Sequence, residues 1–518
     1  MKNETTNHAG ASSSLNRAKL YQLILFPFNN GATNVYYILT MNYIMYHAEG
    51  VLGLAIAFAT SMVTVMRVFD AFTDPIIGML IDRTNGKFGK FRPYIVLGNG
   101  IMIVSSLLMY FGTRIIPADM MWLRYTAYTV IYMLFIIGYT FQTSCTRSGQ
   151  TCITNDPKQR PTFTIFNTVA SLVGMGLVQV VAAFVGGRVG YGSEEFFDFL
   201  IPLAIVLSAG LTVLALVGIW KKDRPEFYGV GQKKEKVKVK EYAKILTGNH
   251  ELQMLVVAGA GTKLAFSIAT NTAVGCLLFG SIMGNYSGLY LPFYIFGYIF
   301  SVPFFLLGLK ISQKHGQKAT LVKFTSFALI MYCGVLALLL MWQPGGSFVL
   351  SLKNINLYTI GFILCYGLGY GAYYSTADMS IPMVADCSDY ETYRSGNYVP
   401  GIIGTLFSLV DKLVSSLSTT IVGLAVVAVG LSTLPDAKTP YADGMKGLTI
   451  VLFCVVPMAA WVATLLAMRF YHLTGERMKE IQAVNAVRKH AISQGMPMEE
   501  AMEKWQTMEQ VPDQFKES

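Results

Sequence analysis

Hydrophobic residues in this chain gather in long runs, and polar and charged residues are concentrated in the segments between them. Many of the runs reach the ~20 residues that a helix needs to cross a lipid bilayer. They cover residues 21–46, 51–80, 93–112, 122–147, 163–187, 197–220, 253–280, 286–309, 320–342, 355–384, 400–429 and 446–471. The pattern predicts an all-α membrane protein with about twelve transmembrane helices.

The longest polar interruption lies near the middle of the chain and divides the runs into two sets of six. We therefore expect an N-terminal six-helix half (1–220), a cytoplasmic linker (221–250), a C-terminal six-helix half (251–471) and a cytoplasmic tail (472–518). Two six-helix halves around a central cavity are typical of one class of secondary transporters. Apolar residues at near-helical spacing predict an amphipathic helix in the tail: Met478, Ile481, Val484, Val487 and Ile492.

Composition agrees with this interpretation. The chain has 518 residues, of which 53% are hydrophobic and 14% are charged, whereas soluble domains carry about 25% charged residues. Basic residues fill the even-numbered connections, as in the segments 83–92 and 310–318, so both termini are expected in the cytoplasm. The net charge of +10 then reflects topology and contact with anionic lipid headgroups, and it does not indicate nucleic-acid binding.

Two aspartates inside the second run, Asp70 and Asp74, carry the clearest chemistry. Their four-residue spacing places both carboxylates on one face of a helix, one turn apart, where unpaired negative charge is expensive. Pro75 has no amide hydrogen, so the carbonyl of Ala71 loses its helical donor and is available as an oxygen ligand. Carboxylate and carbonyl oxygens suit a small hard cation such as Na⁺.

Three blocks of sequence resemble those of a known family. The first runs from Asp70-Ala-Phe-Thr-Asp74-Pro75 through Asp82-Arg83 to Gly89-Lys90-Phe-Arg92-Pro-Tyr94. The second is Ala385-Asp386-Cys-Ser-Asp389-Tyr-Glu391-Thr-Tyr-Arg394, followed by Lys412, and the third is Tyr139-Thr140 with the segment 153–160. In this order the blocks resemble the glycoside–pentoside–hexuronide:cation symporters, the group that contains melibiose permease.

The resemblance implies a major-facilitator fold in the bacterial cytoplasmic membrane that works by alternating access as a monomer. It implies uptake of a small solute, a sugar or glycoside, driven by a cation gradient, with no cofactor beyond the coupling ion (Na⁺ or H⁺). It also implies that Asp70 and Asp74 bind the cation with help from Thr73 and Thr140. Two threonine hydroxyls favour sodium modestly, because a proton does not need them.

The coupling residues are expected beside the aspartates. Arg67 lies on the same helix face as Asp70 and Asp74, and the resemblance places Lys412 nearby. We expect that a cation entering the carboxylate pair releases one basic partner, and that this rearrangement links the ion to solute binding. The alternative is a purely structural ion cluster that holds helices together.

The expected solute site departs from the pattern of melibiose permease. Asn34 and Thr143 replace acidic residues of the first and fourth runs, Arg147 replaces an aromatic residue, and Asp378 follows a position that has lost a tryptophan. Arg147 points toward an acidic solute such as a uronate or a sulfonated sugar, since guanidinium binds anions bidentately. Alternatively, Arg147 snorkels to the membrane edge or pairs with Asp156. A neutral sugar and a non-sugar organic anion stay open.

Further residues are expected to contact the solute or to form a gate. Tyr37, and Tyr373 or Tyr374, can stack on a sugar ring. Salt bridges between two basic and acidic segments are expected to close the cytoplasmic side, through Asp82, Arg83, Lys90, Arg92, Asp386 and Asp389. No HExxH or GxSxG motif is present, so an enzyme is not expected, and a non-transporting membrane receptor is the remaining alternative.

Overall fold

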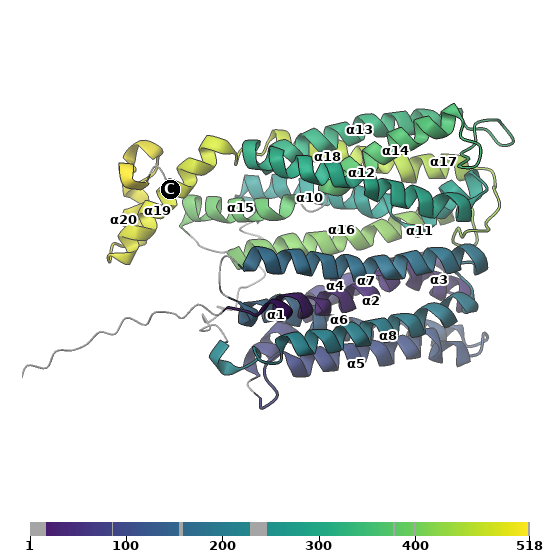
Figure 1. The fold of residues 1–518 in the computed structure, drawn as a ribbon, viewed down its shortest axis with the longest axis horizontal. Coiled ribbons are helices and arrows are strands. Elements are labelled where there is room, and N and C mark those ends of the chain that lie inside the picture. The colour runs from purple at the N-terminus through teal and green to yellow at the C-terminus, as the bar shows by residue number, and fades with distance from the viewer. Residues whose placement is uncertain are drawn as a thin grey trace, which may run out of the picture. The chain divides into compact units, whose positions relative to one another are not determined.

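The computed structural model describes residues 17–84, 86–154, 159–227, 246–376, 379–396 and 400–515, and these residues are overwhelmingly helical. Within them, ten helices are long and apolar enough to cross a membrane (Figure 1). Nine of these spans are α4 (Ile56–Arg83), α5 (Arg92–Tyr110), α6 (Met121–Ile153), α7 (Arg160–Val189), α8 (Glu194–Ile219), α10 (His250–Ala269), α12 (Tyr286–His315), α13 (Gln317–Met341) and α16 (Pro400–Ala428). The tenth is built from α17 (Met445–Ile450), a π segment (Val451–Val455) and α18 (Val456–Arg469). The predicted all-α membrane fold is confirmed.

The first and tenth predicted runs also form helices, but these helices are not among the ten apolar spans. The first is α1 (Leu20–Leu25), α2 (Phe28–Ile38) and α3 (Ile44–Tyr46), joined and extended by π segments at Leu39–Tyr43 and His47–Val51. The tenth is α14 (Leu357–Thr376), whose many tyrosines and glycines lower its hydropathy. A separate helix, α15 (Ser380–Ser395), follows α14, so the helix of the tenth run ends earlier than the predicted residue 384. The seventh run likewise continues as α11 (Thr272–Gly275) and a π segment (Cys276–Ile282).

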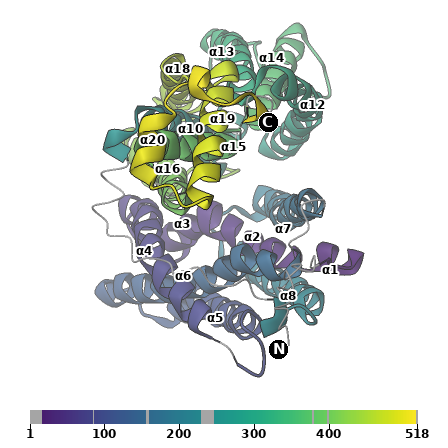
Figure 2. The ribbon, with the colours of Figure 1, turned by 90° about the vertical axis from the view of Figure 1, so that its left-hand side faces the viewer.

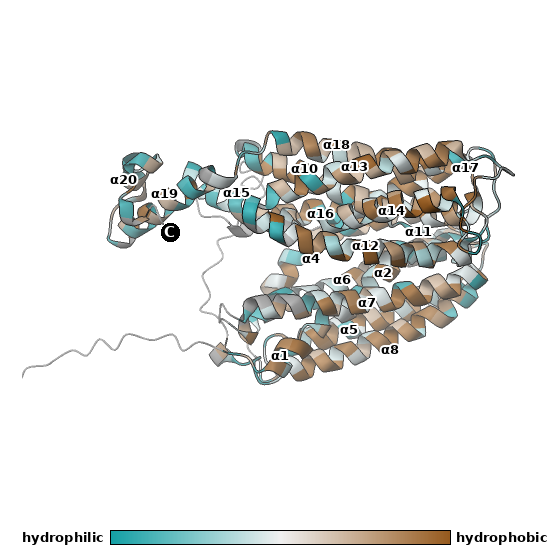
Figure 3. Ribbon diagram, turned by 45° about the horizontal axis from the view of Figure 1, so that its top comes forward, coloured by the Kyte–Doolittle hydropathy of each residue, from teal (hydrophilic) through white to brown (hydrophobic). Residues whose placement is uncertain are grey.

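The chain divides into two compact units. The first unit contains residues 1–40, 69–181 and 197–232, and the second contains residues 41–68, 182–196 and 233–518. Helices α4 and α7, and the first residues of α8, therefore divide between the two units. The predicted boundaries of the two six-helix halves stay a prediction, and residues 228–245 of the predicted linker lie outside the described residues. Apolar residues dominate the long helices, while α15 and the tail are mostly hydrophilic (Figure 3).

In the first unit, one buried carboxylate joins the segment after α8 to the start of α5. Asp223 is fully buried and accepts hydrogen bonds from the backbone N–H groups of Lys90, Phe91 and Arg92 at 2.8–3.2 Å. The Arg92 guanidinium adds an ion pair at 3.3 Å. Gly89 has a φ of +89°, and a Cβ there would collide with the Asp223 carboxylate, so this turn requires glycine. Asp223 thus satisfies the N–H groups that the first turn of α5 leaves unpaired.

In the second unit, the early part of α4 packs along α16. The Thr64 and Thr420 hydroxyls are hydrogen-bonded at 2.9 Å, and the Thr420 hydroxyl also donates to the Thr60 carbonyl at 3.0 Å. Gly423 leaves no room for a Cβ against the Thr60 side chain. Because later residues of α4 meet earlier residues of α16, the two helices run antiparallel.

The tail forms a small structured cap on α15. Helix α19 (Gly475–Ser493) buries Ile481, Val484 and Val487, as the amphipathic pattern predicts, and α20 (Met498–Lys504) follows it. Figure 2 shows both helices over α15. The Arg488 guanidinium donates to the carbonyls of Tyr393 and Trp505 at 2.6–2.9 Å and so ties α15 to the end of α20.

We predict that Asp223→Ala lowers the thermal unfolding midpoint of the purified protein, with a loss on the order of 2–3 kcal/mol, because it leaves buried N–H groups without an acceptor. Lys221→Ala, two residues away and exposed, is the matched control and should change little. Equal midpoints for the two variants would show that the carboxylate does not hold the turn.

Candidate functional site

A buried cluster of oxygen atoms lies between α4 and α6 in the first unit. The Thr140 hydroxyl is 2.7 Å from the Asp70 carboxylate and 3.2 Å from the Thr73 hydroxyl. Thr73 in turn donates to the Asp70 carbonyl at 3.0 Å. Asp70 and Thr140 are both fully buried, and Thr73 is 9% exposed. Three of the four predicted cation-binding residues therefore lie in direct contact.

The hydroxyl of Thr140 has two alternative acceptors for its single hydrogen. It lies 2.9 Å from the Ile136 carbonyl, one turn earlier on α6, as well as 2.7 Å from Asp70. When the hydrogen points to the Ile136 carbonyl, a lone pair of the Thr140 oxygen faces the Asp70 carboxylate. The cluster can thus present either a donor to the carboxylate or an oxygen ligand to a cation.

Asp74, the fourth predicted cation ligand, is half-buried one turn beyond Asp70 on α4. The helix continues through Pro75, which removes one backbone donor and leaves the Ala71 carbonyl without its helical partner. The two carboxylates, the Thr73 hydroxyl and this carbonyl are hard oxygen atoms within about one turn of α4, and α6 adds the Thr140 hydroxyl.

The two predicted coupling residues lie in the second unit. The antiparallel register of α4 and α16, with Thr64 against Thr420, continues toward Arg67 on α4 and toward Lys412 on α16. Arg67 is 3% exposed and Lys412 is half-buried. The register supports neighbouring positions for these two cations, and their role in coupling stays a prediction.

A buried polar network in the first unit was missed by the sequence analysis. The Gln142 amide donates to Asn29 at 3.1 Å and to the Thr212 hydroxyl at 3.0 Å, and Asn29 donates to the Thr146 hydroxyl at 2.7 Å. Asn29 and Gln142 are fully buried. The network joins α2, α6 and α8 at one depth, next to the turn of α6 that carries Thr143. Asparagine and glutamine within apolar runs were the signal that could have revealed it.

The predicted solute residues of the first unit lie on α2 and α6. The Asn34 amide donates to the Asn30 carbonyl at 2.8 Å, and the Thr143 hydroxyl lies 3.0 Å from the Tyr139 carbonyl. Tyr37 is half-buried, and Arg147 is exposed one turn beyond Thr143. Asn34 and Thr143 are therefore bonded to their own helices, whereas the Arg147 guanidinium is accessible.

The remaining solute candidates differ in exposure. Tyr373 is 2% exposed and packs against Tyr332, Tyr370 and Trp461 with ring centroids 5.1–5.9 Å apart. Tyr374, half-buried on the same helix, is the more accessible of the pair. Asp378 lies outside the described residues, as does Asp156, which the alternative for Arg147 invokes.

Three of the predicted gate residues have hydrogen-bond or ion-pair partners within their own units: Lys90, Arg92 and Asp389. Arg92 pairs with Asp223, a residue of the predicted linker, and Lys90 donates its backbone N–H to the same carboxylate. Arg83 is exposed, and the side chain of Asp82 is not among those described. On α15, Asn485 of the tail donates to the Asp389 carbonyl at 2.8 Å. A gate between the two segments stays a prediction.

Asp386 lies beside Asp389 on α15. Burial, and then the neighbouring charge of Asp389, raise the pKa of Asp386 from 3.8 to about 6. Burial also raises the pKa of Asp389. The surroundings of these two carboxylates on α15 therefore disfavour negative charge.

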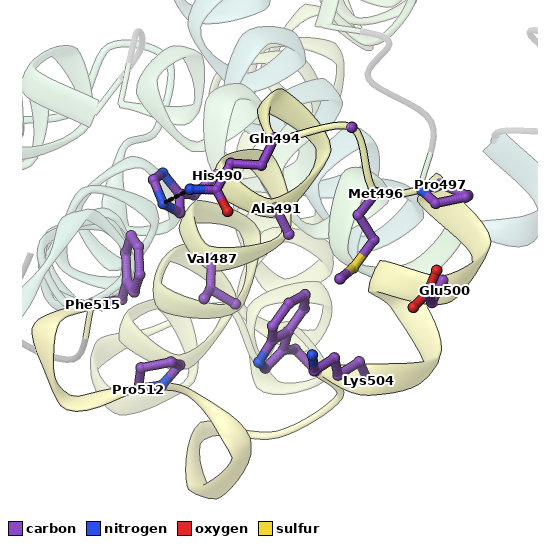
Figure 4. Close-up of a pocket in the computed structure, with 12 residues that line it drawn as sticks. Val487, His490, Ala491, Gln494, Met496, Pro497, Glu500, Lys504, Pro512 and Phe515 are labelled. Atoms are coloured by element: carbon purple, nitrogen blue, oxygen red, sulfur yellow. Dashed lines mark hydrogen bonds between the residues drawn. The ribbon is translucent and has the colours of Figure 1, made fainter.

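A cavity of about 580 Å³ lies in the tail, between α19, α20 and the last described residues. Figure 4 shows His490, Phe515, Glu500 and Lys504 around it. Trp505 also lines the cavity. The cavity contains none of the residues predicted from the sequence to bind the cation or the solute.

The long apolar helices, together with a buried carboxylate–hydroxyl cluster inside them, define a membrane transporter rather than an enzyme. Comparison with known proteins agrees. Residues 28–475 match the family described as MFS/sugar transport protein. The chain belongs to this family, and within it to the glycoside–pentoside–hexuronide:cation symporters of the major facilitator superfamily. The predicted family, fold and location in a bacterial plasma membrane are thereby confirmed.

Several characterised and uncharacterised symporters are similar to the chain. The lactose permease of Lactobacillus delbrueckii subsp. bulgaricus is 24% identical to this chain over 82% of the chain's length. The match covers only 64% of the length of that permease. The putative glycoside/cation symporter YagG of Escherichia coli is 23% identical, over 89% of this chain and 93% of its own. Among solved structures, the nucleoside transporter NupG shares the fold, with a TM-score of 0.56 and 11% identity over 86% of this chain and 98% of NupG.

We predict that Asp386→Asn raises the thermal unfolding midpoint at pH 7.5. An acid whose pKa is raised on folding contributes stability at low pH, and this contribution is lost as the pH rises from 3.8 to about 6. The variant should therefore remove part of the fall in midpoint across that range. Asp443→Asn, at an exposed position, is the control, and identical pH profiles for Asp386→Asn and the parent would contradict the assignment.

Proposed function

We propose that the protein carries a sugar or glycoside into the cell by symport with Na⁺ or H⁺, using alternating access. The curated relatives include a lactose permease and a raffinose carrier protein, which support a carbohydrate as the solute. The observation that carries the proposal is the buried contact between the Asp70 carboxylate and the Thr140 hydroxyl at 2.7 Å. A carboxylate at this depth needs a donor or a cation to offset its charge.

The same contact supports a mechanism for cation binding. Without a bound ion, Thr140 donates its hydrogen to Asp70. When a cation enters, Thr140 turns its hydrogen to the Ile136 carbonyl and offers an oxygen lone pair, with Thr73 and Asp74 completing the set of oxygen ligands. A proton would instead bind a carboxylate directly and would make less use of the hydroxyls.

Coupling then follows from charge balance. A cation bound to Asp70 and Asp74 weakens the attraction that these carboxylates exert on Arg67, which lies three residues before Asp70 on the same helix. Arg67 can then move, and each conformation of the transporter is favoured by a different occupancy of the site. A solute that binds only after this movement is transported only with the ion. Lys412 stays the second predicted coupling residue.

The solute of the proposed symport is either a neutral sugar or an acidic one. A neutral sugar is supported by the relatives that are a lactose permease and a raffinose carrier protein. An acidic sugar is favoured by Arg147, whose guanidinium is exposed one turn from Thr143, where it can bind a carboxylate. Uptake of lactose, raffinose and glucuronate by the same proteoliposomes separates the two candidates.

We predict that Asp74→Asn abolishes gradient-driven accumulation of the transported sugar in proteoliposomes, because the cation loses a charged ligand. Asp119→Asn, an exposed carboxylate on the connection between α5 and α6, serves as the control and should accumulate sugar like the parent. If Asp74→Asn accumulates sugar like the parent and with the same ion dependence, Asp74 does not bind the coupling cation.

Thr140→Val should distinguish sodium from proton coupling, because valine keeps the shape of threonine and removes the hydroxyl. If sodium is the coupling ion, the sodium concentration that gives half-maximal uptake should rise on the order of 10-fold. If a proton is the coupling ion, uptake should instead keep its magnitude and change its pH dependence, since the charged form of Asp70 loses a hydrogen-bond donor. If Thr140→Val changes neither the sodium dependence nor the pH dependence of uptake, Thr140 is not part of the cation site.

A further inference from the structure

A second pair of charged residues lies inside the membrane-spanning helices, in the second unit. The Lys263 ammonium on α10 is 3.2 Å from the Asp411 carboxylate on α16. Both residues lie more than one turn from the ends of their spans, His250–Ala269 and Leu406–Ala428. Charged residues at such a depth are rare and usually functional. None of the functions derived above uses this pair.

The two helices are held in close contact directly beside the pair. A Cβ on Gly259, one turn before Lys263, would lie 2.6 Å from the ring of Phe407, one turn before Asp411. The ring of Phe407 thus packs on the bare backbone of α10. Since each of these residues is four positions before its charged partner, α10 and α16 run parallel in register, and the ion pair is positioned by packing as well as by charge.

The pair is only partly buried. The side chain of Lys263 is 19% exposed and that of Asp411 is 41% exposed. At about 100° per residue, Asp411 lies on the side of α16 away from Thr420 and Gly423, which pack against α4. A charged group left open at this depth in a membrane helix faces the interior of the bundle or water rather than lipid.

Accessible aromatic rings lie next to the pair. Phe266 is half-buried three residues after Lys263, on the same face of α10. Its ring centroid is 5.6 Å from that of Tyr374 on α14. Figure 1 shows α10, α14 and α16 in the same bundle. Aromatic faces beside a few charged hydrogen-bonding groups are the combination that binds the apolar face and the hydroxyls of a sugar ring.

We propose that Lys263 and Asp411 are specificity-determining contacts for the solute. Asp411 accepts hydrogen bonds from hydroxyls through the oxygen that Lys263 does not hold, Lys263 donates to hydroxyl oxygens, and Phe266 with Tyr374 contacts the ring. Because the two charges cancel, the pair favours a neutral polyhydroxyl solute over an acidic one. This inference rests on the proposed function, since it names contacts for the solute of the symporter.

The test compares lactose and glucuronate uptake in proteoliposomes made with the parent, Asp411→Asn and the control Asp443→Asn. Asp411→Asn removes the negative charge that lies 3.2 Å from the Lys263 ammonium, so the KM for lactose should rise on the order of 10-fold, with the maximal rate retained, and the preference should shift toward glucuronate. Asp443→Asn should behave as the parent. An unchanged KM and an unchanged preference in Asp411→Asn would overturn the proposal.

The exchange of the two charges separates binding from structure. The double variant Lys263→Asp with Asp411→Lys restores an ion pair, so its thermal unfolding midpoint should return toward that of the parent while the KM for lactose stays high. Recovery of both the midpoint and the KM would show that the pair only holds α10 to α16, and would refute the role in specificity.

A last arm does not depend on the choice of sugar. If the parent transports neither probe, the proposed function is in doubt, and this arm then decides the inference. Asp411→Cys is treated with the membrane-impermeant reagent 2-sulfonatoethyl methanethiosulfonate, and the modified peptide is identified by mass spectrometry. Modification supports an aqueous, solute-accessible position, whereas an unmodified residue 411 in a folded protein would overturn the proposal.

Discussion

A carboxylate inside an apolar helix bundle must meet a hydrogen-bond donor or a positive charge at its own depth, and this requirement shapes the protein. Asp70 meets the Thr140 hydroxyl between α4 and α6, and Asp411 meets Lys263 between α10 and α16. At the edge of the apolar region, Asp223 meets three backbone N–H groups and Arg92. Each contact favours one pair of neighbouring helices or segments, because moving them apart would leave a buried charge without its partner.

The same requirement explains how a transporter can respond to an ion. In the proposed mechanism, the hydroxyl hydrogen of Thr140 turns away from the carboxylate when a cation arrives, and the Ile136 carbonyl at 2.9 Å is its second acceptor. The change in energy is small because one hydrogen bond replaces another. A small change suits a cycle in which the ion must bind on one side of the membrane and leave on the other.

Spacing along one helix was readable from the sequence, whereas contacts between helices were not. The placement of Asp70 and Asp74 on one face, the break in hydrogen bonding at Pro75 and the apolar face of α19 follow from local periodicity. The contact of Thr140 with Asp70 was expected only from the family resemblance. The partners of Asp223 and of Lys263 were missed because they are far away in the chain, 131–133 residues for the bonds of Asp223. The π segments were missed because hydropathy does not register a change in helical hydrogen bonding.

The contacts of Asp223 also determine how the segment after α8 is attached to the rest of the first unit. They fasten the residues that follow α8 to the turn between α4 and α5. The residues after α8 are therefore anchored at the start of α5, the helix that follows the one carrying Asp70 and Asp74. A displacement of Asp223 would therefore be transmitted directly to the start of α5, through the backbone N–H groups that its carboxylate binds.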